Sequence, residues 1–289
     1  MSTDVLLARF LRELAPLGTR AVWAHGSLAG GDYQEGRSDL DLIAVLPEPP
    51  GLGAVRRVVT AHRRLRAEPL AGRLHCSYVA PANLDDPARP HLTWAHGRLM
   101  RRPVTPVTRR ELHDFGRVLS GEAPAGLLPG VPDAELRGFV VRDQRDYWRP
   151  AVDKARLWRQ DIWVDLGLLT FARATVTLRE GRLVTKREAL GELRELGAPE
   201  EVVADIERRR YPDTTPGTDP APGAGSAAGT GTAAGPDHAL GSGTAAGRNT
   251  APGTGTAPAT AGGHRLAVRA ELTRAYLGPA IDALVAAYG

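Results

Sequence analysis

The chain has 289 residues and is 42% hydrophobic, which is typical of globular proteins and enough to bury a sizeable core. No apolar run reaches the roughly 18 to 20 residues that a membrane span needs, so we expect no membrane partner. The net charge is +4, but basic residues are spread among acidic ones, which disfavours a dedicated nucleic-acid surface. Cys76 is the only cysteine, which excludes an intrachain disulfide and favours a cytoplasmic protein.

The first third of the chain alternates between helical and strand patterns. Its start lacks the basic end and unbroken apolar centre of a signal peptide, and its apolar spacing predicts an amphipathic helix instead. The succession of strand, helix and strand predicts an α/β domain with a mixed sheet over residues 1–105. The predicted elements are a helix over residues 4–15, a strand over 20–27, a strand over 39–46, a helix over 54–66 and a strand over 72–81.

The second part of the chain has helical apolar spacing. Thr108 with Glu111, and Thr185 with Glu188, have the spacing of capping boxes, in which the two side chains bind backbone N–H groups at a helix start. This spacing predicts an all-α helical bundle over residues 106–289. Together with the α/β domain before it, the bundle makes the expected fold an α+β protein of two domains. The predicted helices cover residues 108–121, 132–148, 161–181, 185–196, 199–211 and 265–288.

Residues 212–263 interrupt the helical pattern. The segment is almost entirely Gly, Ala, Thr and Pro. Because it has too little apolar surface to offset the entropy of ordering the chain, we predict a disordered insertion inside the helical domain. A long flexible loop destabilises a fold only slightly once its ends are held, so the insertion is compatible with a folded bundle.

The stretch "HGSLAGGDYQEGRSDLDLIAVL", residues 25–46, carries the strongest chemical signal. Asp39 and Asp41 are two residues apart at the start of a predicted strand, so their carboxylates point to the same face. Two carboxylates this close repel each other, and a bound cation relieves the repulsion. Oxygen ligands favour Mg²⁺, which accepts phosphate oxygens as further ligands. We therefore predict that Asp39 and Asp41 are catalytic and bind magnesium.

Gly26 and Ser27 lie where the first predicted strand ends. A glycine turn before a helix exposes backbone N–H groups that can hold a phosphate, and Ser27 adds a hydroxyl. The chain contains no GxxxxGK[ST] sequence, which excludes a P-loop as the source of phosphate binding. Together the two motifs predict a site for a metal ion and a nucleoside triphosphate. The alternative is a simple turn followed by a surface pair of aspartates.

This stretch resembles the signature of the polymerase-β-like nucleotidyltransferases, which is Gly-Ser, about ten residues, and then Asp-x-Asp in a strand. Members of that superfamily transfer a nucleoside monophosphate from a triphosphate to an acceptor hydroxyl, with pyrophosphate leaving. The resemblance implies two Mg²⁺ ions between the aspartates and the triphosphate.

The helical part narrows the resemblance. The stretches "LLTFARATVTLREGRLVTKREAL" and "RAELTRAYLG" resemble the C-terminal helical domain of the aminoglycoside adenylyltransferases that modify streptomycin and spectinomycin. This resemblance implies that ATP is a co-substrate and that Arg173, Lys186 and Tyr276 contact it. Lys186 is one of only two lysines in a chain rich in arginine, which favours a role as a compact charge for phosphate.

One position departs from that family. Its members carry a third carboxylate in the next strand, to which general-base catalysis on the acceptor hydroxyl is assigned. Here the matching stretch "LHCSYV" places His75 at that position. A neutral histidine can accept a proton at physiological pH, so we predict that His75 is catalytic. A histidine that is merely buried in the strand is the alternative.

The resemblance predicts a Mg²⁺-dependent enzyme that transfers AMP from ATP to a hydroxyl of a small acceptor, with an aminoglycoside-type antibiotic as the leading class. Asp161 and Asp165 are the candidates for holding such a cationic acceptor. One alternative is an enzyme of the same fold with another acceptor, a protein or an RNA. The other is a nucleotide-binding module without turnover, which the missing third carboxylate favours. We expect the protein to be a cytoplasmic monomer.

Overall fold

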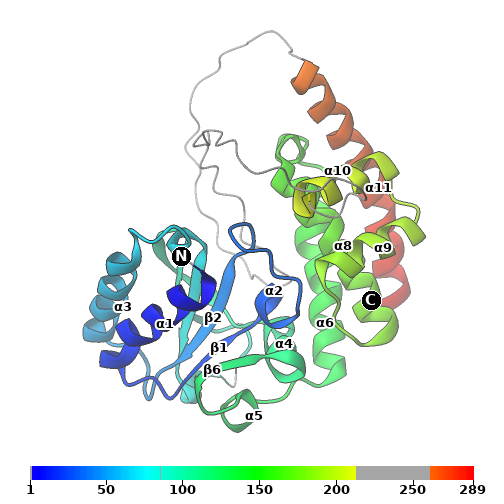
Figure 1. Cartoon of the computed structure of the whole chain (residues 1–289). Coiled ribbons are helices and arrows are strands. Elements are labelled where there is room, and N and C mark those ends of the chain that lie inside the picture. The colour runs from blue at the N-terminus through cyan, green and yellow to red at the C-terminus, as the bar shows by residue number, and fades with distance from the viewer. Residues whose placement is uncertain (1, 85, 213–260) are drawn as a thin grey trace.

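The computed structural model of the protein describes residues 2–84, 86–212 and 261–289. Figure 1 shows two lobes, of which one is built on a β-sheet and the other consists of helices. The insertion predicted over residues 212–263 lies outside the described residues, except at its two ends, where the last helix begins at Ala261. In the described part of the chain, no helix is long and apolar enough to cross a membrane.

The first lobe contains the mixed sheet that the sequence predicts. Its strand order is β5-β4-β3-β2-β1-β6, and β2 and β3 are its parallel pair, while the other neighbours are antiparallel. The three strands predicted from the sequence are β1, β2 and β3, which therefore lie side by side. The strands are β1 (Ala21–Ala24), β2 (Leu40–Val45), β3 (Leu74–Val79), β4 (Pro90–Ala95), β5 (Arg98–Pro103) and β6 (Arg117–Gly121).

Helices cover both faces of the sheet (Figure 1). Side chains alternate along β2, so Leu42 packs against α1 and α3 on one face, while Ile43 packs on the face of α4. Asp41 shares the face of Ile43 by the same alternation. The helices of this lobe are α1 (Thr3–Leu14), the single turn α2 (Gly26–Ala29), α3 (Leu52–Leu65), α4 (Pro106–Phe115) and the single turn α5 (Pro124–Leu127).

The helix predicted over residues 108–121 is wrong in both start and end. The Thr105 side chain caps α4 by accepting from the Thr108 N–H at 3.2 Å, and a proline follows at the first helical position, where its missing N–H does no harm. Residues 117–121 form β6, which pairs with the open edge of β1. The sheet therefore extends past residue 105, which the sequence analysis predicts as the end of the first domain. The division of the chain into domains of residues 1–105 and 106–289 stays a prediction.

The hairpin of β4 and β5 was not predicted from the sequence. Its turn is His96-Gly97, and both residues have positive φ, at 50° and 72°. Two consecutive residues of positive φ are typical of tight hairpin turns, whose twist matches that of the strands. Because histidine is rarely found in this conformation, the dipeptide gives a weak hairpin signal.

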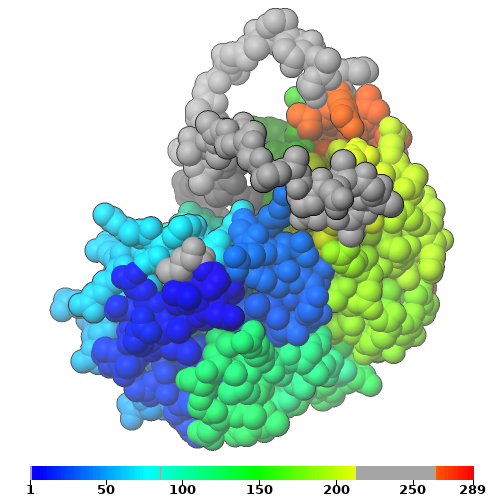
Figure 2. Space-filling model, viewed as in Figure 1, coloured from blue at the N-terminus to red at the C-terminus, as the bar shows by residue number. Residues whose placement is uncertain are grey.

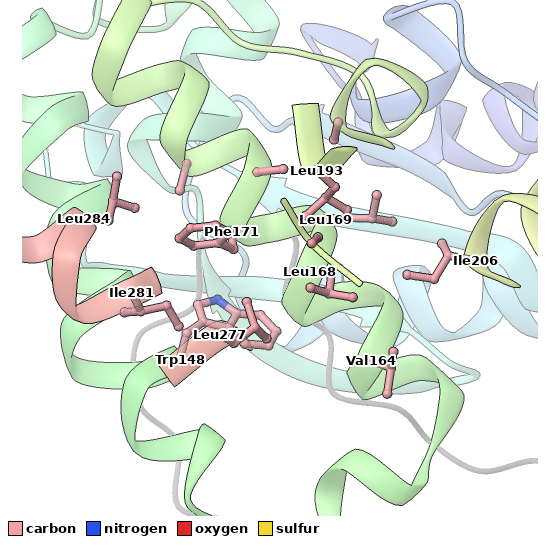
Figure 3. Close-up of a cluster of buried hydrophobic side chains, with 14 of the residues drawn as sticks. Trp148, Val164, Leu168, Leu169, Phe171, Leu193, Ile206, Leu277, Ile281 and Leu284 are labelled. Atoms are coloured by element: carbon pink, nitrogen blue, oxygen red, sulfur yellow. The ribbon is translucent and has the colours of Figure 1, made fainter. Parts of the chain in front are cut away.

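The second lobe is helical, as predicted. Its longest fully described helix, α8, is buried along most of its length and packs against α11, which brings Leu277, Ile281 and Leu284 to the core around Phe171 (Figure 3). The predicted capping box of Thr185 and Glu188 is confirmed at the start of α9. The helices are α6 (Asp133–Asp143), a π-helical turn (Gln144–Trp148), α7 (Arg149–Val152), α8 (Asp161–Glu180), α9 (Lys186–Glu195), α10 (Glu200–Arg210) and α11 (Ala261–Tyr288).

Candidate active site

A cavity of about 890 Å³ lies between the two lobes. Its walls come from the turn between β1 and α2, from β2 and β3, from the β4–β5 hairpin and α4, and from α8 and α9 of the helical lobe. This volume is typical of small-molecule sites. Seven residues that the sequence predicts for the site line the cavity, namely Gly26, Ser27, Asp39, Asp41, His75, Arg173 and Lys186.

His25, Asp41 and His75 form a row across β1, β2 and β3. The His25 backbone N–H donates to the Asp41 carbonyl at 3.0 Å, and Asp41 pairs with His75 in the parallel register. Nδ1 of His75 lies 3.6 Å from Oδ1 of Asp41. Burial raises the pKa of Asp41, but the interaction with His75 and the charges of His25 and Lys186 outweigh burial, so the pKa is lowered overall. The Asp41 carboxylate is therefore ionised in the folded protein.

Asp39 and Asp41 have the donor chemistry of a magnesium site. Both line the cavity, and their side chains remain 40% and 33% exposed. Oδ1 of Asp39 lies 3.4 Å from Nη1 of Arg73, a long contact that a stronger cation can replace. Two carboxylates fit a Mg²⁺ ion that takes its remaining ligands from water and phosphate. Among the described residues, no group of three or more His, Cys, Asp and Glu side chains is placed to hold a metal ion.

Gly26 lies against the Asp41 carboxylate. Its φ of +61° favours glycine, and a Cβ at this position would lie 2.9 Å from Oδ2 of Asp41. The absence of a side chain at Gly26 therefore keeps the turn next to the carboxylate. Ser27 follows in α2 and lines the same part of the cavity. The two halves of the sequence motif are thus brought into contact by the pairing of β1 with β2.

His75 is only 7% exposed, and its Nε2 makes no hydrogen bond within the described part of the chain. The ring packs edge to face against His96 of the hairpin turn, with 4.5 Å between ring centroids. His75 thus lines the cavity and presents one nitrogen to Asp41, while its other nitrogen is buried without a partner in the described residues. No pattern in the sequence assigns His96 to the site, because its place depends on a hairpin that was not predicted.

Arg173 reaches the cavity from α8 and binds a buried carboxylate that the sequence assigned to helix capping. Its Nη2 donates to Oε1 of Glu111 at 3.0 Å, and its Nε donates to the carbonyl of Val184 at 2.8 Å. The other Glu111 oxygen lies 3.1 Å from Nδ1 of His25. Burial raises the pKa of Glu111, but the bond with His25 and the charge of Arg173 outweigh it and lower the pKa overall. Glu111 therefore joins both lobes as a carboxylate.

Lys186 is the first residue of α9 and lines the cavity across from the aspartates. Burial, together with the charges of Arg210 and Arg173, lowers the pKa of Lys186 to about 8, against the opposing effect of Asp41 and Asp39. A cation held near other cations in this way gains stability when an anion such as phosphate binds. This placement supports the predicted phosphate contact.

A second contact between the lobes closes the cavity beside Lys186. Asp32, in the loop after α2, accepts from the backbone N–H of Arg187 at 3.2 Å and from the hydroxyl of Tyr211 at 2.7 Å. Arg37 of the same loop donates to the carbonyl of Arg209 at 2.9 Å. Figure 2 shows the blue segment of the first lobe in direct contact with the yellow-green helices. The loop between the two sequence motifs thus holds the helical lobe in place.

Three predicted residues do not line the cavity. Tyr276 packs against Phe171, and its hydroxyl donates to the carbonyl of Leu196 at 3.3 Å. Asp165 is buried in a two-pronged ion pair with Arg209, and Asp161 pairs with an arginine of α11. The ATP contact of Tyr276 and the acceptor contacts of Asp161 and Asp165 stay predictions, and the two carboxylates already have partners within the helical lobe.

The comparisons with known proteins agree with this geometry. Residues 6–74 match the family described as "Nucleotidyltransferase domain", and this range contains Gly26, Ser27, Asp39 and Asp41. No curated protein matches the chain at a significant level. Among solved structures, the fold is similar to that of the spectinomycin adenyltransferase AAD(9) from Enterococcus faecialis, which was determined with ATP and spectinomycin.

That similarity has a TM-score of 0.58 at 13% sequence identity, and it covers 75% of this chain and 92% of the other. At this identity the similarity concerns the fold alone. The aligned part is 75% of the chain, far more than the residues 6–74 of the family match, so it includes residues of both lobes. Residues 6–74 are therefore similar to a nucleotidyltransferase domain, and the overall fold is similar to that of the AAD(9) adenyltransferase.

Proposed function

We propose that the protein transfers AMP from ATP to a hydroxyl group of a small acceptor. The observation that carries the proposal is the convergence, in one cavity between the lobes, of the Asp39–Asp41 pair, the Gly26–Ser27 turn and Lys186. The first two belong to the part of the chain that matches the nucleotidyltransferase domain family. The third comes from the other lobe, so a ligand that needs all of them must lie between the lobes.

Asp39 and Asp41 would hold Mg²⁺, which when bound neutralises charge on the triphosphate and orients it. Ser27 and the backbone of the turn would bind a terminal phosphate of ATP, and Lys186 would add a positive charge from the opposite wall. The acceptor hydroxyl attacks the α-phosphorus, the bond to pyrophosphate breaks, and Nε2 of His75 takes the hydroxyl proton. His75 lines the cavity and its Nε2 has no other partner in the described residues, which supports this role. Because that nitrogen is buried, the step requires the bound substrates to bring it into contact with the hydroxyl.

The leading acceptor class in this proposal is an aminoglycoside-type antibiotic. Its support is the resemblance in sequence and in fold, since the similar AAD(9) structure contains spectinomycin. Asp161 and Asp165 already form ion pairs with arginines, which favours a binding mode in which the acceptor does not contact these two carboxylates. Another carboxylate on the cavity wall would have to meet the amino groups of the acceptor.

The first test is pyrophosphate release by the full-length protein with Mg²⁺, each of the four nucleoside triphosphates, and streptomycin, spectinomycin and neutral sugars in turn. We expect release with ATP and an aminoglycoside, its loss on chelation of Mg²⁺, and its loss in Asp39→Ala. Asp153→Ala is the matched control, because Asp153 is an exposed carboxylate that does not line the cavity.

If pyrophosphate is released with ATP only when the acceptor is a neutral sugar, the proposal of adenylyl transfer stands, but the acceptor class is a neutral sugar instead of an aminoglycoside. Binding of Mg²⁺ and ATP without release for any acceptor would favour the second candidate, a nucleotide-binding module without turnover. The observation behind that candidate is the histidine, instead of a third carboxylate, that pairs with Asp41 in the register of β2 and β3.

A further inference from the structure

We propose that Glu111 is a positioning residue, which fixes Arg173 of the helical lobe and His25 of the sheet lobe so that both act on the phosphates of the bound nucleotide. This inference rests on the proposed function and adds two residues to it. The sequence resemblance assigned neither Glu111 nor His25 a role in nucleotide binding, although His25 begins the stretch that carries the Gly26–Ser27 motif. All three side chains line the cavity and are nearly buried, with exposed fractions of 9% for Glu111, 11% for Arg173 and 15% for His25.

The hydrogen bonds of Glu111 divide evenly between the lobes. One oxygen accepts from Nη2 of Arg173, and the other lies 3.1 Å from Nδ1 of His25. Because a carboxylate can only accept, Nδ1 of His25 carries the hydrogen, and the orientation of the ring is fixed by that bond. The Glu111 side chain thus sets the orientation of two planar groups, the imidazole of His25 and the guanidinium of Arg173, which come from chain segments far apart in sequence.

Arg173 and His25 each keep one nitrogen atom that can bind a ligand. Nε and Nη2 of Arg173 are engaged by Val184 and Glu111, and Nη1 makes no hydrogen bond to the described residues. Likewise, Nε2 of His25 makes none to the described residues. His25 directly precedes Gly26 and Ser27, so a phosphate held at that turn lies next to the imidazole. A guanidinium that is oriented before the ligand arrives binds phosphate with less loss of entropy.

Burial alone does not explain the arrangement. A buried Arg–Glu pair contributes little net stability compared with apolar side chains of similar size, because both charges lose their hydration. The helical lobe contains another Arg–Glu pair with an equally buried glutamate, in which the half-exposed Arg179 binds both oxygens of Glu192 at 2.6 and 2.9 Å. Glu192 does not line the cavity, so its pair can only be structural. The two pairs provide a matched comparison within one chain.

The test is calorimetric binding of ATP and of adenosine, with Mg²⁺ and without acceptor, to the full-length protein and to Glu111→Gln and Glu192→Gln. Both variants neutralise one buried glutamate of nearly the same exposure, 9% and 8%. We expect Glu111→Gln to raise the Kd for ATP by about tenfold and to change the Kd for adenosine less than about twofold, because only ATP carries phosphates. We expect Glu192→Gln to leave both values unchanged.

Equal weakening of ATP and adenosine in Glu111→Gln would overturn the inference, because it would indicate a general distortion of the site. Unchanged ATP binding would overturn it as well. If Glu111→Gln does not fold, Glu111→Asp replaces it, since the charge is kept but the shorter side chain cannot reach both partners. A wild-type protein that binds none of the four nucleoside triphosphates would overturn the proposed function itself, and the inference with it.

Discussion

His75 lies directly opposite Asp41 in the parallel register of β2 and β3, with 3.6 Å between Nδ1 and Oδ1. This relationship places an imidazole, which can carry a proton on either nitrogen, next to a carboxylate that fits magnesium. It also leaves Nε2 buried without a hydrogen bond in the described part of the chain. A buried nitrogen without a partner is unfavourable for folding, which is consistent with a position kept for chemistry.

We expect His75→Gln to lower kcat for adenylyl transfer by roughly 10²- to 10⁴-fold, with little change in the KM for ATP, because the variant removes the proton acceptor and leaves the nucleotide contacts. The matched control is His91→Gln, since His91 is also buried, at 4% exposure, and its Nε2 also makes no hydrogen bond to the described residues, but it does not line the cavity. Steady-state kinetics on both variants checks the prediction. A rise in activity in His75→Glu would instead mark the natural chain as having lost turnover.

Local spacing was enough to predict which side chains of the two motifs meet at the cavity, and their roles in holding metal and phosphate stay predictions. Asp39 and Asp41 share a face because strand side chains alternate, and Gly26 and Ser27 follow a strand whose pairing with β2 is antiparallel. Arg173 and Lys186 came from resemblance, and both line the cavity. The roles of Glu111 and His25 depend on the packing of α4 against α8 and the β1–α2 turn, for which the sequence carries no local signal.

The edge strands show why the fold was predicted only in part. Residues 117–121 have the apolar spacing of a helix end, but the open edge of β1 offers backbone hydrogen bonds, and pairing with it decides their conformation. Similarly, β4 and β5 are joined by a turn whose His96 has a positive φ, so no common turn residue marked its first position. Tertiary contacts overrode local preference in both places.

The capping of α4 can be tested through two threonines. The sequence favoured Thr108 as the cap, whereas in the structure the Thr105 side chain accepts from the Thr108 N–H. We expect Thr105→Ala to lower the free energy of unfolding by about 1 kcal/mol, because an N–H at the helix start loses its partner. Thr108→Ala is the control and should change it by less than about 0.5 kcal/mol. Urea denaturation of both variants checks the prediction, and a larger effect at Thr108 would contradict the observed cap.

The lowered pKa of Lys186 predicts that the reaction with ATP depends on pH. The pKa of this side chain is lowered to about 8, so the ammonium is charged below that pH and neutral above it. We expect kcat/KM for ATP to fall as pH rises through about 8, because this ratio reports the free protein. Lys186→Arg should remove the dependence, since guanidinium stays charged. The only other lysine, Lys154, provides the control, and Lys154→Arg should leave the pH profile unchanged. A profile that is the same in Lys186→Arg and wild type would exclude Lys186 as its cause.

The burial of Asp143 predicts that the free energy of unfolding depends on pH, and this effect does not involve the residues of the candidate active site. Asp143 ends α6 at the π-helical turn, and its Oδ2 is buried without a hydrogen bond in the described residues. Burial raises the pKa of Asp143 to about 7, against the opposing effect of a hydrogen bond from Trp148. The fold therefore favours the protonated carboxyl. The destabilisation from this group is absent below the unfolded pKa of 3.8, grows as pH rises, and is complete above about 7.

We expect Asp143→Asn to raise the free energy of unfolding at pH 8 by on the order of 2 kcal/mol, and to give no gain at pH 4, because the amide resembles the neutral acid. Asp146→Asn is the control, since Asp146 lies one turn further along and is 58% exposed. Its effect should stay below about 0.5 kcal/mol at both pH values. Thermal or urea unfolding at the two pH values measures the difference. A gain for Asp143→Asn that is equal at pH 4 and pH 8 would show that the carboxyl is not protonated by burial, because only a titrating group makes the gain depend on pH.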